Sequence, residues 1–264
     1  MVDARVRKAQ QGYEKKDLDL TKQAHTKHAL AEGMHRVEKG RYLGDMVFGA
    51  IDGIVTTFAV VAGVAGASLS FSVVLILGFA NLFADGFSMA MGNFLSIKSD
   101  QDYFKREHDR ESWEIDNVPM GEKEEIRQIY RAKGFKGKDL ERAVEIITSE
   151  KKVWVDEMMK HELNLPGFEE KSAVKGALAT FLAFGVAGFI PLVSYLLVFV
   201  IPGIDDLAFE IAIILTAIVL FVVGSLRSFL IAKKWYIAGF EMLLVGMLAA
   251  SVAYLVGFGL NQLL

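Results

Sequence analysis

Long apolar runs, separated by short polar turns, make up most of the chain after residue 43. A helix needs about 20 mostly apolar residues to cross a bilayer, because the hydrocarbon layer is roughly 30 Å thick and each residue adds about 1.5 Å. Five runs meet that length and predict spans at about 44–67, 71–97, 173–200, 207–231 and 236–260. A hydrophobic fraction of 53% and a mean hydropathy of +0.34 agree with an integral membrane protein.

Outside the spans, two polar segments are predicted to be helical. They are the N-terminal tail, 1–43, and an insert at about 100–170 that separates the spans of 44–99 from those of 171–264. In the insert one helix continues from the second span to Pro119, and breaks at "NVPMG", "KGFKGK" and "LNLPGF" predict three more at about 122–133, 137–149 and 151–163. No segment alternates like a strand, so we expect an all-α polytopic membrane protein with five transmembrane helices.

The basic residues predict which side of the membrane each segment faces. Of the 29 lysines and arginines, ten precede Gly44, sixteen lie from Lys98 to Lys175 and three lie at 227–234. The turns "ASLSFS" and "VIPGIDDLAFE" and the C-terminal "NQLL" contain none. Because basic loops stay on the cytoplasmic side, we expect a cytoplasmic tail and insert and an external C-terminus. The polar start of the chain also predicts no cleavable signal peptide.

Composition excludes several kinds of chemistry. With no cysteine, disulfides, thiolate zinc sites and iron–sulfur ligation are impossible, so a metal would need carboxylate, imidazole, thioether or backbone oxygen. A net charge of −3 leaves no basic surface for nucleic acid. There is no Gly-x-x-x-x-Gly-Lys loop for ATP, and the single Glu-x-x-His pair, Glu32 and His35, disfavours a di-iron ferroxidase. We therefore expect neither an enzyme nor a prosthetic group.

Ionisable side chains inside the spans form the first candidate site. Asp52 lies in the first span and Asp85 in the second. A charge at mid-bilayer costs roughly 2.5–3.5 kcal/mol, so an ionisable residue there is expected to have a function that offsets the cost. Four-residue spacing places a transport-pathway stripe on one face of the second span: Asn81, Asp85, Met89 and Asn93. Such a face suits a partly dehydrated divalent cation. In the alternative interpretation, the aspartates only hydrogen-bond neighbouring helices and Met89 fills space.

A second set of candidate metal ligands lies in the insert. Its members are carboxylates and thioethers: Glu107, Glu111, Glu114, Glu122, Glu125, Met158, Met159 and Glu162. Carboxylates without thiols suit hard or borderline divalent ions, and methionine favours a softer one such as Fe(II). Glutamates on a charged helix more often form a solvated face with i,i+4 pairs, and the pattern alone favours that interpretation.

Two sequence segments resemble the signature of the vacuolar iron transporter family. They are "FGAIDGIVTTFAVVAGVAGA" and "ADGFSMAMGNFLSIKSDQDYFKRE", and "WVDEMMKHELNL" and "EMLLVGMLAASVAYLVG" are similar as well. The resemblance implies a homodimeric five-span transporter that exchanges cytosolic Fe(II) or Mn(II) for protons, with its path formed by the first two spans at the dimer interface. It matches Asp52 and Met89 to pathway residues. It also matches seven residues to a cytosolic metal site: Glu111, Glu114, Glu122, Glu125, Met158, Met159 and Glu162.

The chain departs from the family pattern at one position of the pathway stripe. Asn93 follows Gly92 where many members carry an acid, and Asp85 lies two helical turns earlier on the same face. One interpretation is that the acid has moved along the stripe. The pair Gly49 and Gly53 beside Asp52 allows another helix to approach closely, and it is the only feature besides the resemblance that favours a dimer.

From these features we expect an exporter of cytosolic Fe(II) or Mn(II) that is driven by returning protons. A prokaryotic chain would lie in the plasma membrane, and a eukaryotic one in the vacuolar membrane. One alternative is a membrane metal sensor or buffer that transports nothing. Another is an organic-cation transporter, which the lack of aromatic residues around Asp52 disfavours, since Phe58 is the only one between it and the outer end of the span.

Overall fold

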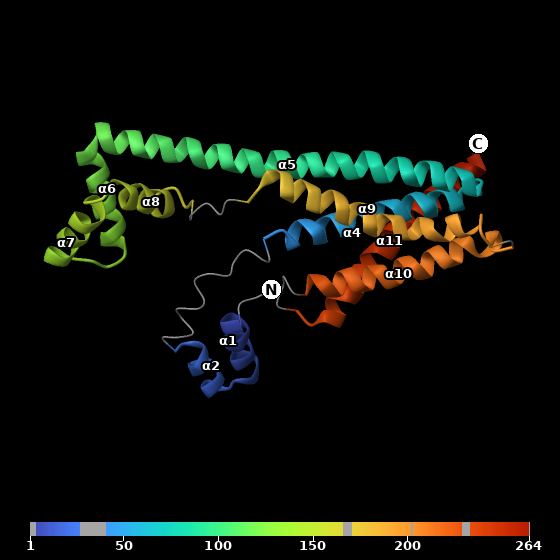
Figure 1. Cartoon of the computed structure of the whole chain (residues 1–264), viewed down its shortest axis with the longest axis horizontal. Helices are drawn as coiled ribbons and strands as arrows, with labels where there is room; N and C mark the ends of the chain where they lie inside the picture. The colour runs from blue at the N-terminus through green and yellow to red at the C-terminus, as the bar shows by residue number, and fades with distance from the viewer. Residues whose placement is uncertain (1–3, 27–40, 166–170, 202, 229–232, 264) are drawn as a thin grey trace. The chain divides into compact units, whose positions relative to one another are not determined.

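The computed structural model describes residues 4–26, 41–165, 171–201, 203–228 and 233–263, and every regular element in these ranges is a helix (Figure 1). The chain divides into two compact units. The span unit comprises Met1–Phe94 and Val174–Leu264, and the insert unit comprises Leu95–Ala173.

The span unit contains the predicted membrane helices and two short helices of the tail. The tail helices are α1 (Ala4–Lys15) and α2 (Leu18–Ala24), and the long apolar ones are α4 (Leu43–Gly66), the first part of α5 (Phe71–Asn117), α9 (Ala173–Leu197), α10 (Ala208–Arg227) and α11 (Trp235–Leu263). A short 3₁₀ turn, Asp205–Leu207, precedes α10. Among the described residues, five helices are long and apolar enough to cross a membrane, which confirms the predicted fold class. Their ends lie within about four residues of the predicted ones, except that α5 continues into the insert unit as the sequence predicts.

Small residues let the backbones of the span helices approach closely around α4. A Cβ added at Gly49 would lie 2.3 Å from the Thr180 carbonyl oxygen of α9, and one added at Gly53 would lie 2.3 Å from that of Phe184. At the other end of α4, a Cβ at Gly66 would lie 2.2 Å from the Tyr254 carbonyl oxygen of α11. The helix α4 therefore packs closely against α9 and α11 at positions where only glycine fits.

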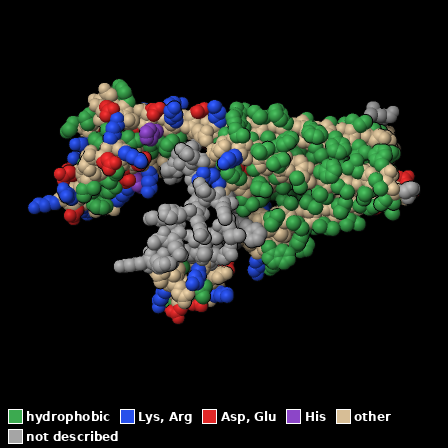
Figure 2. Space-filling view, viewed as in Figure 1, with side chains coloured by type: hydrophobic (Ala, Val, Ile, Leu, Met, Phe, Trp, Pro, Cys, Tyr) green, Lys and Arg blue, Asp and Glu red, His purple; other side chains and the backbone are tan. Residues whose placement is uncertain are grey.

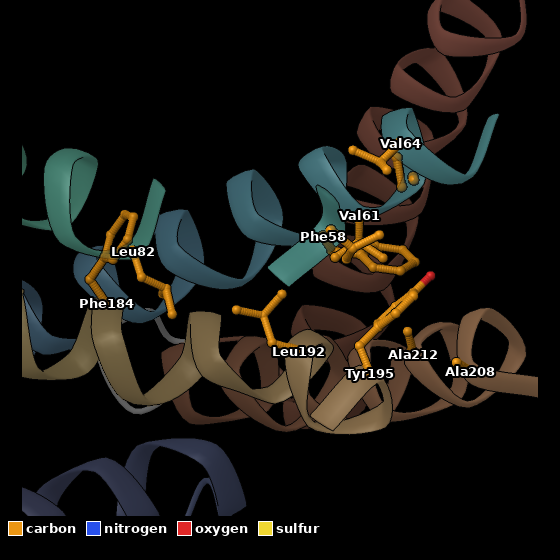
Figure 3. Packing of buried hydrophobic residues seen from close by; sticks show 12 residues of the cluster. Phe58, Val61, Val64, Leu82, Phe184, Leu192, Tyr195, Ala208 and Ala212 are labelled. Atoms are coloured by element: carbon orange, nitrogen blue, oxygen red, sulfur yellow. The ribbon is translucent and has the colours of Figure 1, made fainter. Parts of the chain in front are cut away.

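The core of the span unit is filled by side chains from all five long helices, with Ala250 contributed by α11 (Figure 3). Phe58, Val61 and Val64 come from α4 and meet residues of α5, α9 and α10: Leu82, Phe184, Leu192, Tyr195, Ala208 and Ala212. Apolar side chains also cover the outer face of this unit, as the surface of a membrane-embedded bundle should be (Figure 2).

The insert unit is formed by the polar end of α5 with α6 (Pro119–Ala132), α7 (Gly137–Thr148) and α8 (Lys151–His161). Pro119 starts α6 three residues earlier than predicted, because its fixed φ and missing N–H suit the first helical position. Gly134, with φ of +100°, ends that helix. A small apolar core holds the unit together: Ile115, Ile126, Leu140, Val144, Trp154, Val155, Met158 and Met159. Charged side chains cover its surface (Figure 2).

Candidate functional site

The two intramembrane aspartates lie on facing turns of α4 and α5. These helices are antiparallel neighbours joined by the four-residue turn 67–70. The Asn81 amide of α5 donates to the hydroxyls of Thr56 and Thr57 of α4, at 3.4 and 3.3 Å, which fixes the register of the pair. One turn onward from Asn81 is Asp85, and one turn back from Thr56 is Asp52. The carboxylates of Asp52 and Asp85 are close enough to interact electrostatically.

The other members of the pathway stripe make contacts between helices. The Asn93 amide donates to the Thr180 hydroxyl of α9 at 2.8 Å, and this hydroxyl donates in turn to the Gly176 carbonyl at 3.1 Å. Met89 packs against the apolar core of the span unit. The asparagines therefore hold α5 to α4 and to α9, and Asp85 is the charged residue of the stripe.

Gly49 and Gly53 have a partner in the same chain. Both pack against the backbone of α9, at Thr180 and Phe184. The pair thus does not support a dimer, contrary to the interpretation from the sequence, because the close approach it permits is already used within one protomer.

In the insert unit, Glu111 and Glu122 are buried carboxylates. Their residues are 1% and 6% exposed, although they sit in a helical unit with a largely charged surface. The Oε2 atoms of both have no hydrogen-bond partner in the described part of the chain. A solvated face would leave these oxygens in water, whereas burial without a hydrogen bond costs free energy, so the two glutamates are not simply surface residues.

Burial and mutual repulsion make these carboxyls weak acids. Desolvation is the main cause that raises the pKa of Glu111, Glu122 and Glu162 to about 7 each, and the charges of neighbouring glutamates add to it. The neighbours that act on one or more of the three include Glu114 and Glu125, so the insert unit gathers five of the predicted carboxylates into one electrostatic cluster, here called the glutamate cluster. Such a cluster exchanges protons near neutral pH.

Arg110 is the basic side chain at the edge of this cluster. Its Nη2 lies 2.6 Å from Glu111 Oε1, in a contact without hydrogen-bond geometry, and its Nη1 donates to Glu114 Oε2 at 2.6 Å. Its Nε donates to Glu107 at 3.0 Å. Arg106 also donates to Glu107, and these two hydrogen bonds hold the pKa of Glu107 below its usual range. Glu107 is thus an ordinary ion-paired carboxylate.

The two methionines lie in the apolar core of the insert unit. Met158 and Met159 are 0% and 2% exposed and pack among the other core side chains. Glu162 follows directly after α8, whose last turn holds Met158. In the described residues, no three His, Asp or Glu side chains are already arranged around one metal position.

Comparison with known proteins identifies the family. The model of the VIT family matches residues 43–258, which include α4 to α10 and most of α11. The chain belongs to the VIT family. This confirms the resemblance seen in the sequence.

Several VIT-family relatives match over most of their length. The chain is 36% identical to the vacuolar iron transporter of Toxoplasma gondii over 95% of this chain and 86% of the relative. It is 34% identical to that of Plasmodium falciparum, over 99% and 98%. It is 33% identical to vacuolar iron transporter 1 of Arabidopsis thaliana, over 83% and 88%.

Two further residues of this VIT-family chain touch the candidate sites, and the sequence interpretation overlooked both. Arg110 lies three residues after Glu107, one before Glu111 and four before Glu114, and this spacing could have identified it as their counter-ion. Thr180 could not have been found in this way, because it lies 87 residues from Asn93 in the sequence. Only the folded bundle brings that pair together.

Proposed function

We propose that this chain is a membrane iron transporter that exports Fe(II), with Mn(II) as a second substrate, from the cytosol in exchange for protons. Its relatives are named iron transporters, and five apolar helices provide the membrane-embedded bundle. The observation that carries the proposal is the pair of carboxylates, Asp52 and Asp85, on facing turns of two of these helices. Two such groups in a membrane offer the charge that a divalent cation needs.

In this proposal the glutamate cluster captures the ion. The insert and the tail face the cytosol, as the distribution of lysine and arginine predicts. Carboxylates are the ligands that Mn(II) and Fe(II) accept without thiols, and a cluster on the cytosolic side would raise the local concentration of the ion. The thioethers of Met158 and Met159 would favour Fe(II) if the unit opens enough to expose them.

The ion then passes along the pathway stripe. Asp52, Asp85 and Met89 bind it, while Asn81 and Asn93 hold the helices that carry these ligands. When the metal leaves, the two facing carboxylates repel each other, and a returning proton relieves that repulsion. Metal and proton therefore compete for the same oxygens, which links the two fluxes.

The exposed apolar faces of α4 and α5 are the proposed contact between two protomers. Phe48 of α4 with Phe83 and Phe87 of α5 are 58%, 67% and 61% exposed in one chain. A homodimer through these faces would bring α4 and α5 of both protomers together. The membrane is the vacuolar one if the chain is eukaryotic, as its named relatives are, and the plasma membrane if it is prokaryotic.

Proteoliposomes that hold a metal-sensitive dye and an acidic interior test the transport proposal. Wild-type protein should carry Fe(II) inward and protons outward, and Asp52→Asn and Asp85→Asn should each lower the Fe(II) flux by at least tenfold, because a neutral amide cannot balance a dehydrated cation. Asp206→Asn, an exposed acid before α10, is the matched control and should transport normally. Full flux in both Asp52→Asn and Asp85→Asn would reject the pathway, and metal binding without flux in wild type would favour the sensor or buffer.

A further inference from the structure

Arg110 places one guanidinium group against three carboxylates. Each of its three nitrogens meets a different glutamate: Nε meets Glu107 at 3.0 Å, Nη1 meets Glu114 at 2.6 Å and Nη2 meets Glu111 at 2.6 Å. All four residues lie on the polar end of α5, within two turns of one helix. The guanidinium therefore occupies the position at which the carboxylate oxygens of this face converge.

This arginine compensates the charge of the metal-free cluster. Glu111 is 1% exposed, and a buried carboxylate needs a nearby cation or a proton. Among the described residues, no basic side chain other than Arg110 forms an ion pair with Glu111 or Glu114. Its charge also acts against the rise in the pKa of Glu111, Glu122 and Glu162. Without it, the carboxylates would repel one another more strongly.

A divalent ion that binds the cluster competes with Arg110 for the same oxygens. The guanidinium and the metal ion are both cations and repel each other. Glu111 Oε1 and Glu114 Oε2 therefore cannot bind both of them strongly at the same time. The Arg110 side chain is 40% exposed, so it can turn into water by rotation of its own bonds without any change in α5. Departure of the arginine costs the entering metal part of its binding free energy and helps the metal to leave again.

We propose that Arg110 is a built-in cation that occupies the carboxylates of the metal-free insert unit and is displaced when a divalent metal ion binds. The inference rests on the proposed capture of metal by the glutamate cluster. As a consequence, the affinity of the insert unit for the metal ion is moderate. A transporter needs an ion that is bound and then released, and a tethered competitor favours release without removing any ligand.

Titration of the purified full-length protein with Mn²⁺, with free Mn²⁺ followed by electron paramagnetic resonance, tests the proposal. Arg110→Gln should bind Mn²⁺ about tenfold more tightly than wild type, a size between that of an exposed and a buried ion pair. It should also release Mn²⁺ to excess EDTA more slowly. The matched control is Arg127→Gln, which removes another arginine that contacts two glutamates, Glu124 and Glu141, outside the cluster. This control should bind as wild type does.

Unchanged or weaker binding in Arg110→Gln would overturn the proposal, because a purely structural arginine holds ligands in place and its loss cannot improve affinity. Should that variant fail to fold without metal, Arg110→Lys provides the second test. It keeps the charge but cannot meet three carboxylates at once, and affinity equal to or below that of wild type would again reject the idea. Failure of the capture proposal itself looks different: Glu111→Gln and Glu122→Gln would then leave wild-type Mn²⁺ binding unchanged.

Discussion

At the scale of single residues, burial rather than residue type decides what each glutamate of α5 can do. Glu107 and Glu111 lie one turn apart and both contact Arg110. Hydrogen bonds from two arginines hold the pKa of Glu107 low, whereas desolvation raises the pKa of Glu111 to about 7. Only the second carboxyl changes its charge near neutral pH. The sequence places both on one face and cannot rank them, because the difference in their burial arises only when the insert unit folds.

The raised pKa values predict that metal binding and stability depend on pH in opposite directions. A metal needs ionised carboxylates, so the Mn²⁺ affinity should rise from pH 6 to pH 8, by roughly tenfold for each of Glu111, Glu122 and Glu162 that must lose a proton. The folded, metal-free unit holds protons that the unfolded chain releases above a pKa of about 4.5. Its free energy of unfolding should therefore fall as the pH rises from about 4.5 to about 7, and then level off.

Mn²⁺ titrations of the full-length protein at pH 6, 7 and 8 check this prediction, together with thermal unfolding without metal at the same pH values. Glu122→Gln removes one of the three titrating groups and should flatten both profiles. Glu145→Gln changes an exposed glutamate of α7 and should not. An affinity that is equal at pH 6 and pH 8 would contradict the assignment of these carboxyls as ligands.

At the scale of helices, the sequence predicts the elements well and their neighbours poorly. Apolar runs long enough to cross a bilayer identify all five spans, because the requirement is local and strict. The break at Pro119 likewise marks the end of α5. The glycines beside Asp52 indicate that some helix approaches closely, but the choice between α9 and a second protomer depends on contacts more than 100 residues away. For the same reason, the sequence predicts Asn93 as a pathway residue, but it does not predict that the Asn93 amide donates a hydrogen bond to Thr180.

The packing of α4 against α9 predicts which glycines tolerate a methyl group. In Gly53→Ala the new Cβ would lie 2.3 Å from the Phe184 carbonyl oxygen, so the helices must separate. We expect a loss of about 1–3 kcal/mol in stability, the usual cost of overpacking, and a lower midpoint of thermal unfolding in detergent. Gly185→Ala on α9 is the control, since no atom lies within 4 Å of its Cβ. Equal midpoints for the two variants would mean that α9 does not occupy the Gly49–Gly53 face.

At the scale of the whole molecule, the chain joins a unit with an apolar surface to one with a charged surface (Figure 2). The apolar surface of the span unit suits lipid, and the charged surface of the insert unit suits water. Export requires that the glutamate cluster and the turn between α4 and α5 lie on opposite sides of the membrane. Two positions lie on opposite sides when an odd number of spans separates them. The mechanism therefore depends on the number of spans as much as the fold does.

The absence of cysteine makes that topology directly measurable. Single variants Ser70→Cys, in the turn between α4 and α5, and Ser149→Cys, after α7, introduce exposed thiols at the two test positions. In intact right-side-out membranes, a maleimide that cannot cross the bilayer should label Ser70→Cys and should reach Ser149→Cys only after permeabilisation. Gln262→Cys, at the end of α11, should behave like Ser70→Cys, because an odd number of spans separates it from the tail. Labelling of Ser149→Cys in intact membranes would place the glutamate cluster outside the cytosol, where it could capture no ion for export.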